Sequence, residues 1–173
     1  MRIVPTKALA QQALVALKAM LEDAYGEPLV EDWDHALGGT HFLIEEDGGP
    51  VSHASVVERA LETGGRVWRT GYVEAVATRP DRQHRGLGTR VMEEASEYIR
   101  REYELGGLGT GEFGFYAPFG WEIWRGPTSV RIDDRVERTP GEDGYIMILR
   151  TAASADLDLT APITCEWRTG DVW

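Results

Sequence analysis

Apolar and polar positions along the chain repeat with two different periods, and these periods predict its secondary structure. Residues 6–25 (TKALAQQALVALKAMLEDAY) place Leu14, Leu17 and Leu21 three and four positions apart, which is the spacing of one helix face. The amphipathic pattern of 86–101 predicts a second helix of similar length. Both segments are long enough to bury one face against a sheet.

The remaining apolar segments are shorter and predict strands. We expect strands over 41–46, 51–61, 66–78, 145–149 and 163–167. Residues 26–40 are acidic and predict a loop, while 105–121 (LGGLGTGEFGFYAPFGW) predict a short strand, a glycine turn and a short helix carrying Tyr116. Together these elements predict one α/β domain over 1–173, with a mixed, mainly antiparallel sheet flanked by helices.

Composition excludes several classes of protein. The chain has 173 residues, a formal net charge of −11 and a single cysteine, Cys165. A strongly acidic protein is a poor partner for nucleic acid, because phosphates need a broad basic face, but its acidity suits a polycationic partner. No apolar run approaches the ~18 residues needed to cross a bilayer, and one cysteine with four histidines gives no metal-ligand spacing. We therefore expect a cytoplasmic protein without metal, membrane or nucleic-acid partners.

One segment departs from the acidic background. Within residues 79–90 lie four arginines, Arg79, Arg82, Arg85 and Arg90, around the sequence QHRGLG. This turn lacks the Lys of a Walker loop and the third glycine of a dinucleotide fingerprint. Its glycines open the backbone N–H groups at a helix start to an anion such as a pyrophosphate. An ordinary strand-to-helix turn with solvated arginines is the alternative.

The surrounding sequence VATRPDRQHRGLGTRVMEEA (76–95) resembles the central motif of the GNAT N-acetyltransferases. That resemblance implies a sheet splayed at an acetyl-CoA site, with acetyl-CoA as co-substrate and no metal. It also implies main-chain contacts to the pantetheine arm from Val76 and Thr78. The pyrophosphate contacts it implies come from Gln83, His84, Arg85, Gly86, Leu87, Gly88 and Thr89.

A narrower resemblance covers 26–173. The strings DWDHALGGTHFLI, GYVEAVA, LGGLGTGEFGFYAPFGW, GPTSV and CEWRTGDVW are similar to those of the aminoglycoside 2'-N-acetyltransferases. This resemblance implies a resistance enzyme, often a homodimer, that acetylates the 2'-amine of aminoglycosides.

Acetyl transfer to an amine needs a proton acceptor for the amine and a proton donor for the departing thiolate. Glu74 stands in an otherwise apolar strand, two residues before Val76 and on the same face by strand alternation. It can act as a base directly or through a water, or it can simply face solvent. The resemblance favours Glu74 as the base and implies that Tyr116 is the acid, with the Val76 N–H donating to the thioester carbonyl; a buried core tyrosine is the alternative for Tyr116.

A polycationic substrate requires a pocket rich in carboxylates. Our preferred substrate contacts are Asp32, Asp143, Asp171 and Trp173, followed by Glu27 and Glu142. The resemblance implies that the carboxylate of Trp173 enters the pocket. For each acidic residue taken singly, a solvated surface charge is the alternative, so the hypothesis depends on the group.

Two other functions fit the same motif. One is acetylation of a different amine, such as a kasugamycin-type amino sugar or a polyamine. The other is that of a non-catalytic domain that binds coenzyme A as a sensor. The sensor hypothesis predicts cofactor binding without turnover.

Overall fold

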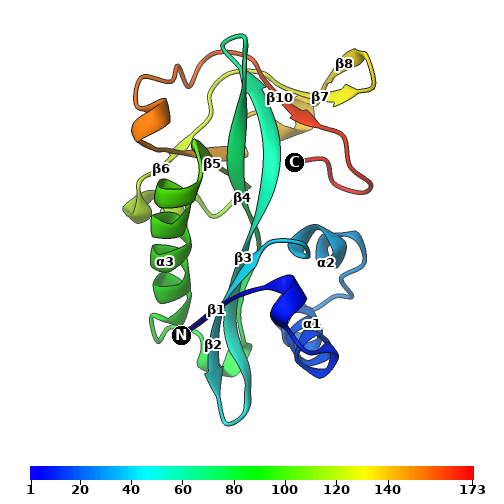
Figure 1. Ribbon diagram of the computed structural model, residues 1–173, viewed down its shortest axis with the longest axis vertical. Coiled ribbons are helices and arrows are strands. Elements are labelled where there is room, and N and C mark those ends of the chain that lie inside the picture. Colours follow the sequence, from blue (N-terminus) through cyan, green and yellow to red (C-terminus); the bar gives the residue numbers. More distant parts are fainter. The chain divides into compact units, whose positions relative to one another are not determined.

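The structure, a computed structural model, describes residues 1–173 as an alternation of strands and helices (Figure 1). The α-helices are α1 (Gln11–Tyr25), α2 (Glu31–Ala36), α3 (Leu87–Glu102) and α4 (Phe113–Tyr116). The strands are β1 (Arg2–Pro5), β2 (Thr40–Glu46), β3 (Gly49–Thr63), β4 (Arg66–Thr78), β5 (Leu105–Gly109), β6 (Trp121–Ile123), β7 (Thr128–Ile132), β8 (Arg135–Arg138), β9 (Ile146–Arg150) and β10 (Ile163–Glu166). No helix has both the length and the apolar composition needed to span a bilayer.

The chain divides into two compact units that share three elements. The first unit comprises Met1–Val57 and Val73–Ala95, and the second comprises Glu58–Tyr72 and Ser96–Trp173. Strands β3 and β4 and helix α3 each contribute residues to both units.

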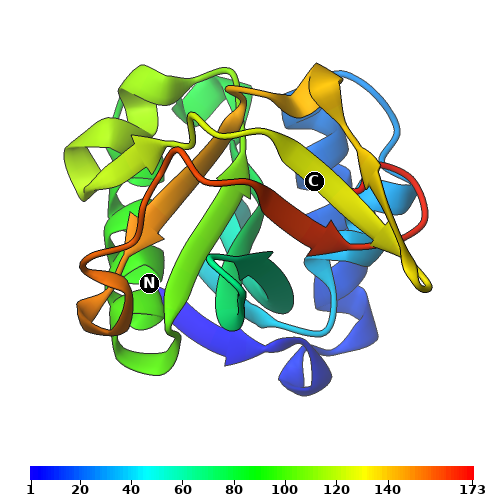
Figure 2. The ribbon, with the colours of Figure 1, turned by 90° about the horizontal axis from the view of Figure 1, so that it is seen from above.

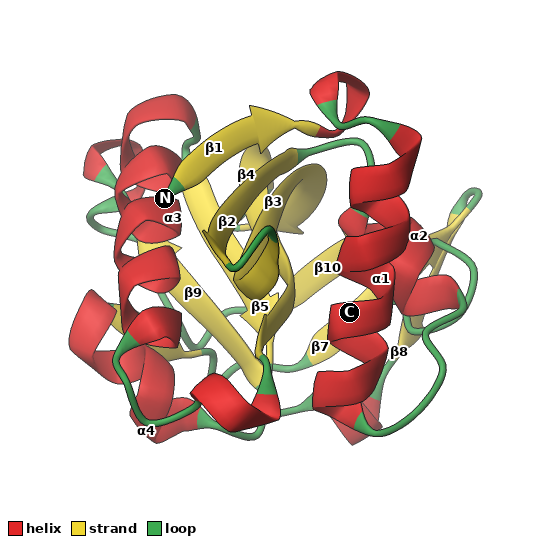
Figure 3. Cartoon of the chain, turned by 90° about the horizontal axis from the view of Figure 1, so that it is seen from below, coloured by secondary structure: helices red, strands yellow, loops and turns green.

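In the first unit, β1, β2 and the first part of β3 pair in an antiparallel arrangement. The registers include Val4↔His41 for β1 with β2, and Phe42↔Ala54 for β2 with β3. Helices α1 and α2 lie on one side of these strands and the beginning of α3 lies on the other (Figures 1 and 3).

The core of the first unit is built around the apolar face of α1. Leu17 and Leu21 are almost fully buried, as the helical spacing predicts, and they belong to a cluster with residues of β1, β2 and the loop after α1. The helix ends at Tyr25. The N–H of the next residue, Gly26, bonds the Glu22 carbonyl, and its φ of 78° turns the chain out of the helix. Ala75 and Ala77 of β4 pack against the same cluster, so α1 supports the end of β4.

In the second unit the strands follow the order β6-β9-β5-β4-β3-β10-β7-β8. The pairs β4–β5 and β7–β10 are parallel, whereas β3–β10, β5–β9, β6–β9 and β7–β8 are antiparallel. Figure 2 shows β10 (red) beside β7 (yellow). Strand β9 lies between β5 and β6 and buries four consecutive residues, Ile146 to Leu149, as a strand covered on both faces must. The predicted mixed, mainly antiparallel α/β fold is confirmed.

The structure corrects three details of the predicted elements. The helix expected over 6–25 begins only at Gln11, because Thr6–Ala8 form a 3₁₀ turn and the chain is extended at Leu9 and Ala10. The loop expected over 26–40 contains α2, whose first turn holds three acidic residues where the helix dipole favours them. Strands β1, β6, β7 and β8 were not expected; β7 and β8 form a hairpin whose turn includes Asp133 at a φ of 51°.

Candidate active site

The backbone of β4 is irregular near its end, in the first unit. Ala75 has a φ of 50°, a left-handed conformation that a residue other than glycine adopts only when its surroundings enforce it. The Ser55 hydroxyl donates to the Glu74 carbonyl at 3.2 Å, and the Tyr25 hydroxyl donates to the Val76 carbonyl at 3.0 Å. These carbonyls bond side chains, as occurs where a bulge disturbs a ladder. Glu74 itself is half-buried.

The glycine turn follows directly and joins β4 to α3. Gln83 donates its side-chain amide to the Thr78 carbonyl at 3.2 Å, which ties the turn to the strand. His84 and Gly86 have positive φ values of 59° and 73°, on either side of a residue with a negative φ. This alternation turns successive backbone N–H groups toward one concave side, the arrangement that binds anions. Leu87, Gly88 and Thr89 form the first turn of α3.

A side chain on Gly86 would meet no protein atom, because nothing lies within 4 Å of an ideal Cβ there. The turn is therefore open at the position where an anion would approach. The residue types and the conformation both fit a bound pyrophosphate.

The arginines around the turn divide into two pairs. Arg79 bonds Asp81 at 2.5 Å, and Arg82 bonds Glu46 at 3.0 Å as well as Asp81. Arg85 and Arg90 are exposed and make no ion pair. Arg85 and Arg90 are therefore the two of the four arginines whose charge is available to an anion. The sequence alone indicates four.

The predicted acidic contacts of the first unit lie on its surface. Glu27 follows α1 and Asp32 stands in the first turn of α2, and both side chains are exposed. The dipole of α2 favours the carboxylate of Asp32 in its first turn, whereas Glu27 lies outside both helices. Neither residue has a bond that fixes it in place.

Tyr116 ends α4 in the second unit and is 9% exposed. Burial raises the pKa of its hydroxyl to about 12, against the effect of a hydrogen bond with Thr110. The Thr110 N–H donates to the Tyr145 carbonyl at 2.8 Å, and the Tyr145 N–H donates to the Glu142 carbonyl at 3.0 Å. These bonds connect the turn that precedes α4, the helix of Tyr116, with the turn that carries Glu142.

Glu142 and Asp171 form an acidic pair in the second unit. Burial first, and the charge of Asp171 second, raise the pKa of Glu142. Trp173 follows Asp171 by two residues and is 4% exposed, and its Nε1–H donates to the Thr139 hydroxyl at 2.9 Å. Two carboxylates that disfavour each other's charge provide a place where a cation is stabilising.

Asp143, by contrast, is fully engaged with its own protein. One carboxylate oxygen accepts from the Thr128 N–H at 2.8 Å and the Thr128 hydroxyl at 2.9 Å, and the other accepts from Arg138 at 2.6 Å. These bonds lower its pKa. The structure gives Asp143 a role in holding the 139–143 turn on β7.

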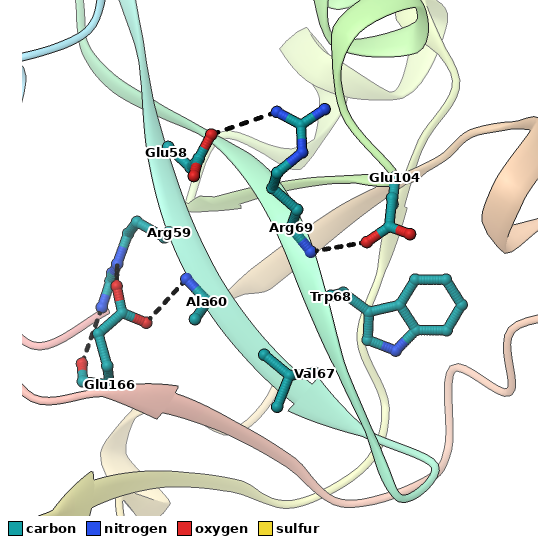
Figure 4. Close-up of a pocket in the computed structure, with 8 residues that line it drawn as sticks. All are labelled: Glu58, Arg59, Ala60, Val67, Trp68, Arg69, Glu104 and Glu166. Carbon is teal, nitrogen blue, oxygen red and sulfur yellow. Dashed lines mark hydrogen bonds and ion pairs between the residues drawn. The ribbon is translucent and has the colours of Figure 1, made fainter.

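A groove of about 390 Å³ in the second unit lies along the β3–β4 hairpin (Figure 4). It is lined by Glu58, Arg59, Ala60, Val67, Trp68, Arg69, Glu104 and Glu166. Arg69 bonds Glu58 at 3.2 Å and its N–H bonds Glu104 at 3.0 Å, while Arg59 bonds Glu166 at 3.1 Å. Each charged side chain of this groove has a partner of opposite charge, that of Glu104 being Arg66 outside the groove. None of the predicted site residues lines it.

Two histidines beside β4 carry no signal in the sequence. His41 on β2 and His53 on β3 are fully buried, and His53 contacts the carbonyl of Ala75 at 2.7 Å. The one feature that could have identified them is a histidine at a buried position in each of two adjacent strands.

The chain matches a family model described as an acetyltransferase (GNAT) domain over residues 6–124. It therefore belongs to the GNAT acetyltransferase family. It is also 42% identical to an aminoglycoside 2'-N-acetyltransferase from Mycolicibacterium fortuitum, over 99% of this chain and 91% of that protein. This second match confirms the narrower resemblance to the aminoglycoside 2'-N-acetyltransferases.

Solved structures support the fold. A GNAT family N-acetyltransferase from Escherichia coli, in complex with CoA, gives a TM-score of 0.69 at 16% identity, over 98% of this chain and 92% of that one. A probable N-acyltransferase from Enterococcus faecalis gives a TM-score of 0.60 at 14% identity, over 73% of this chain. This chain spans 33% of the length of that protein and of two further solved relatives.

Proposed function

We propose that this chain transfers the acetyl group of acetyl-CoA to the 2'-amine of aminoglycosides. The observation that carries the proposal is the 42% identity, over 99% of the chain, to a protein named aminoglycoside 2'-N-acetyltransferase. Similarity over nearly the full length of both chains includes the segments that would contact substrate. A likeness of fold alone would not support a substrate.

The first unit offers the residues that would hold acetyl-CoA. The open turn at Gly86, with the backbone N–H groups that precede α3, suits the pyrophosphate. Arg85 adds a positive charge beside it. The main chain of Val76 and Thr78 would bond the pantetheine arm, as the family resemblance implies.

Acetyl-CoA supplies a thioester that an amine can attack without a covalent enzyme intermediate. Glu74 would take a proton from the amine as the new C–N bond forms. The Val76 N–H would donate to the thioester carbonyl, where negative charge develops. Tyr116 would give its proton to the sulfur as the C–S bond breaks, and its raised pKa keeps that proton in place at neutral pH.

Carboxylates would bind the ammonium groups of the aminoglycoside. Glu142 and Asp171 are the stronger candidates, because their mutual repulsion would be relieved by a cation. Glu27 and Asp32 would add longer-range attraction. The terminal carboxylate of Trp173, one oxygen of which accepts from Arg168 at 2.9 Å, would enter the pocket and contact the substrate, as the family resemblance implies. Asp143 would contribute by holding the turn that carries Glu142.

The test is thiol release from acetyl-CoA with a panel of amines: tobramycin, kanamycin A, kasugamycin and spermidine. Tobramycin has a 2'-amine, whereas kanamycin A has a hydroxyl there and keeps its other amines. We expect turnover with tobramycin and none with kanamycin A, because only the first presents the reacting group. Light scattering of the same preparation tests the homodimer that the family resemblance implies.

Equal turnover of both drugs would refute the 2' position. Turnover of kasugamycin or spermidine alone would keep acetyl transfer and change the acceptor. Binding of acetyl-CoA without thiol release in any reaction would favour the sensor function over catalysis.

A further inference from the structure

His41 and His53 form a pair of imidazoles in the interior of the first unit. Both rings are 0% exposed, and Nδ1 of His41 lies 2.9 Å from Nε2 of His53. The ring centroids are 5.2 Å apart. Buried polar rings of this kind are retained only when their nitrogens have partners.

Both outer ends of the pair have partners. Nδ1 of His53 lies 2.7 Å from the Ala75 carbonyl oxygen, and Nε2 of His41 lies 2.7 Å from the Thr6 hydroxyl. The Gly38 N–H donates to the same hydroxyl at 3.0 Å. The result is a continuous chain of hydrogen bonds from the 38–39 turn to the irregular end of β4.

The direction of every hydrogen bond in this series follows from the last acceptor, the Ala75 carbonyl. A carbonyl can only accept, so Nδ1 of His53 carries a proton and its Nε2 is the acceptor. His41 must then donate from Nδ1 and accept at Nε2, so the Thr6 hydroxyl donates to His41. Thr6 also lies 3.2 Å from the Gly39 carbonyl, but donation there would require His41 to donate from Nε2 and would leave two acceptors facing each other between the rings.

The neutral state of both rings is secure. Burial lowers the pKa of His41 to about 4 and that of His53 to about 3, and the charge of His41 adds to the effect on His53. Each ring is therefore uncharged at neutral pH and is held in its Nδ1–H form by its neighbours.

The chain of hydrogen bonds ends at the Ala75–Val76 peptide, whose N–H would contact the thioester carbonyl in the proposed reaction. The Ala75 carbonyl and the Val76 N–H belong to one planar trans peptide, so they point in opposite directions. A donor that holds the carbonyl fixes the direction of the N–H. It also polarises the amide, which makes the N–H a stronger donor. The register of β4 with β5 ends at Tyr72↔Gly107, before this peptide is reached.

We propose that His53 is a positioning residue: held in one tautomer by His41 and Thr6, it orients and polarises the Ala75–Val76 peptide so that the Val76 N–H is presented to the thioester carbonyl. This inference rests on the proposed acetyl transfer. It also explains why Ala75 keeps a φ of 50°, since the bond from His53 stabilises that conformation.

The first test uses the unmodified protein and no substrate. Heteronuclear NMR of the histidine ring nitrogens at neutral pH identifies the tautomer of each imidazole. We expect the Nδ1–H form for both His41 and His53. An Nε2–H form or a charged ring at His53 would overturn the inference, whatever the chain acetylates.

The second test compares two substitutions that differ in where they put the donor. In His53→Asn the side-chain amide can occupy the place of Nδ1, whereas in His53→Gln it occupies the place of Nε2. We expect His53→Asn to stay within about threefold of the original kcat and His53→Gln to lose about tenfold, less than the loss of an oxyanion donor itself. KM for acetyl-CoA should change little in either variant.

The Val76 amide resonance provides a readout that a purely structural role would not move selectively. It should shift in His53→Gln and stay near its original position in His53→Asn. Equal kcat values and equal Val76 resonances in all three proteins would overturn the inference. Should both His53 variants unfold, Thr6→Val is an alternative, because it changes only a half-buried residue. An unaltered His41 tautomer and an unaltered Val76 resonance in Thr6→Val would also overturn the inference.

These outcomes separate the two proposals. A chain that acetylates none of the amines refutes the proposed function, while the ring tautomers and the Val76 resonance still decide whether His53 holds this peptide. A chain that acetylates tobramycin, but whose kcat is the same with Gln or Asn at His53, keeps the function and removes the positioning role.

Discussion

At the scale of single residues, burial decides which groups hold a proton. It raises the pKa of Tyr116 to about 12, so the phenol keeps its proton and can donate it. It lowers the pKa of His41 and His53, so their rings stay neutral. The same physical cause, removal from water, therefore keeps a candidate acid protonated and two candidate positioning rings uncharged.

Replacing Tyr116 by Phe removes the proposed acid and keeps the ring packed against Phe115. We expect kcat for tobramycin to fall about 10²-fold, the lower range for a lost general acid, with KM for acetyl-CoA nearly unchanged. Because the pKa of Tyr116 is near 12, the original enzyme should show no alkaline loss of activity from this group below that pH.

The matched control is Tyr98→Phe, which makes the same change on α3 at a ring that packs against Tyr103. Its kcat should stay close to the original value. Turnover of Tyr116→Phe at the original rate over several pH values would remove Tyr116 from the mechanism.

Candidate site residues can be proposed from the sequence where their context is local. The turn from Gln83 to Thr89 could be found because all of its features lie within seven consecutive positions. His41 and His53 could not, because strand register brings them together and their partners, Thr6 and Ala75, are 35 and 22 residues away. Likewise, only the fold shows that Asp143 is occupied by Thr128.

At the scale of elements, two long periodic segments were predicted almost to the residue, whereas α1 begins five residues later than expected. Strand β4 has the expected bounds, and α3 begins and ends one residue later than expected, with Val91, Ala95 and Ile99 fully buried. Some short elements were missed, such as α2 with six residues (EDWDHA) and β8 with four (RVER), because neither holds enough apolar residues to show a period.

The turn before α3 can be tested by adding side chains at Gly86. Gly86→Val places a β-branched residue at a φ of 73°, so it should destabilise the protein by about 1–2 kcal/mol. Its side chain would also stand where the pyrophosphate approaches. We expect the Kd for coenzyme A, measured by calorimetry, to rise about tenfold or more.

Gly86→Asn separates conformation from access, because Asn tolerates positive φ but still carries a side chain. It should weaken coenzyme A binding with little loss of stability. Gly49→Val is a suitable control in β3, since its Cβ also meets no protein atom and its φ is not positive. An unchanged Kd in both Gly86 variants would refute the role of the turn.

At the scale of the whole molecule, three elements connect the stability of the two units. Strands β3 and β4 and helix α3 each run without a break from one unit to the other. Loss of pairing in one unit therefore removes support from strands that the other unit needs. We accordingly retain the prediction of one domain, with thermal unfolding in a single transition.

The buried histidines make that stability depend on pH. Their folded pKa values of about 4 and 3 lie below the ordinary value of 6.5, so between these limits the unfolded chain binds more protons than the folded one. These two groups should therefore leave stability unchanged well above pH 6.5. Stability should fall as the pH drops through 6.5 toward 4, by up to about 1.4 kcal/mol per pH unit for each histidine.

Urea unfolding at fixed ionic strength between pH 5.5 and 7 measures this slope. The window lies about one pH unit or more above the ordinary values of 4.5 and 3.8 for carboxyls whose folded pKa is lowered, such as those of Glu104 and Asp143. His53→Asn removes one of the two titrating groups and should reduce the slope by up to half, and the double variant with His41→Asn should nearly abolish it. A slope equal to the original in the double variant would show that groups other than this pair take up the protons, and the rings would then not be the buried neutral imidazoles from which the orientation of Val76 is inferred.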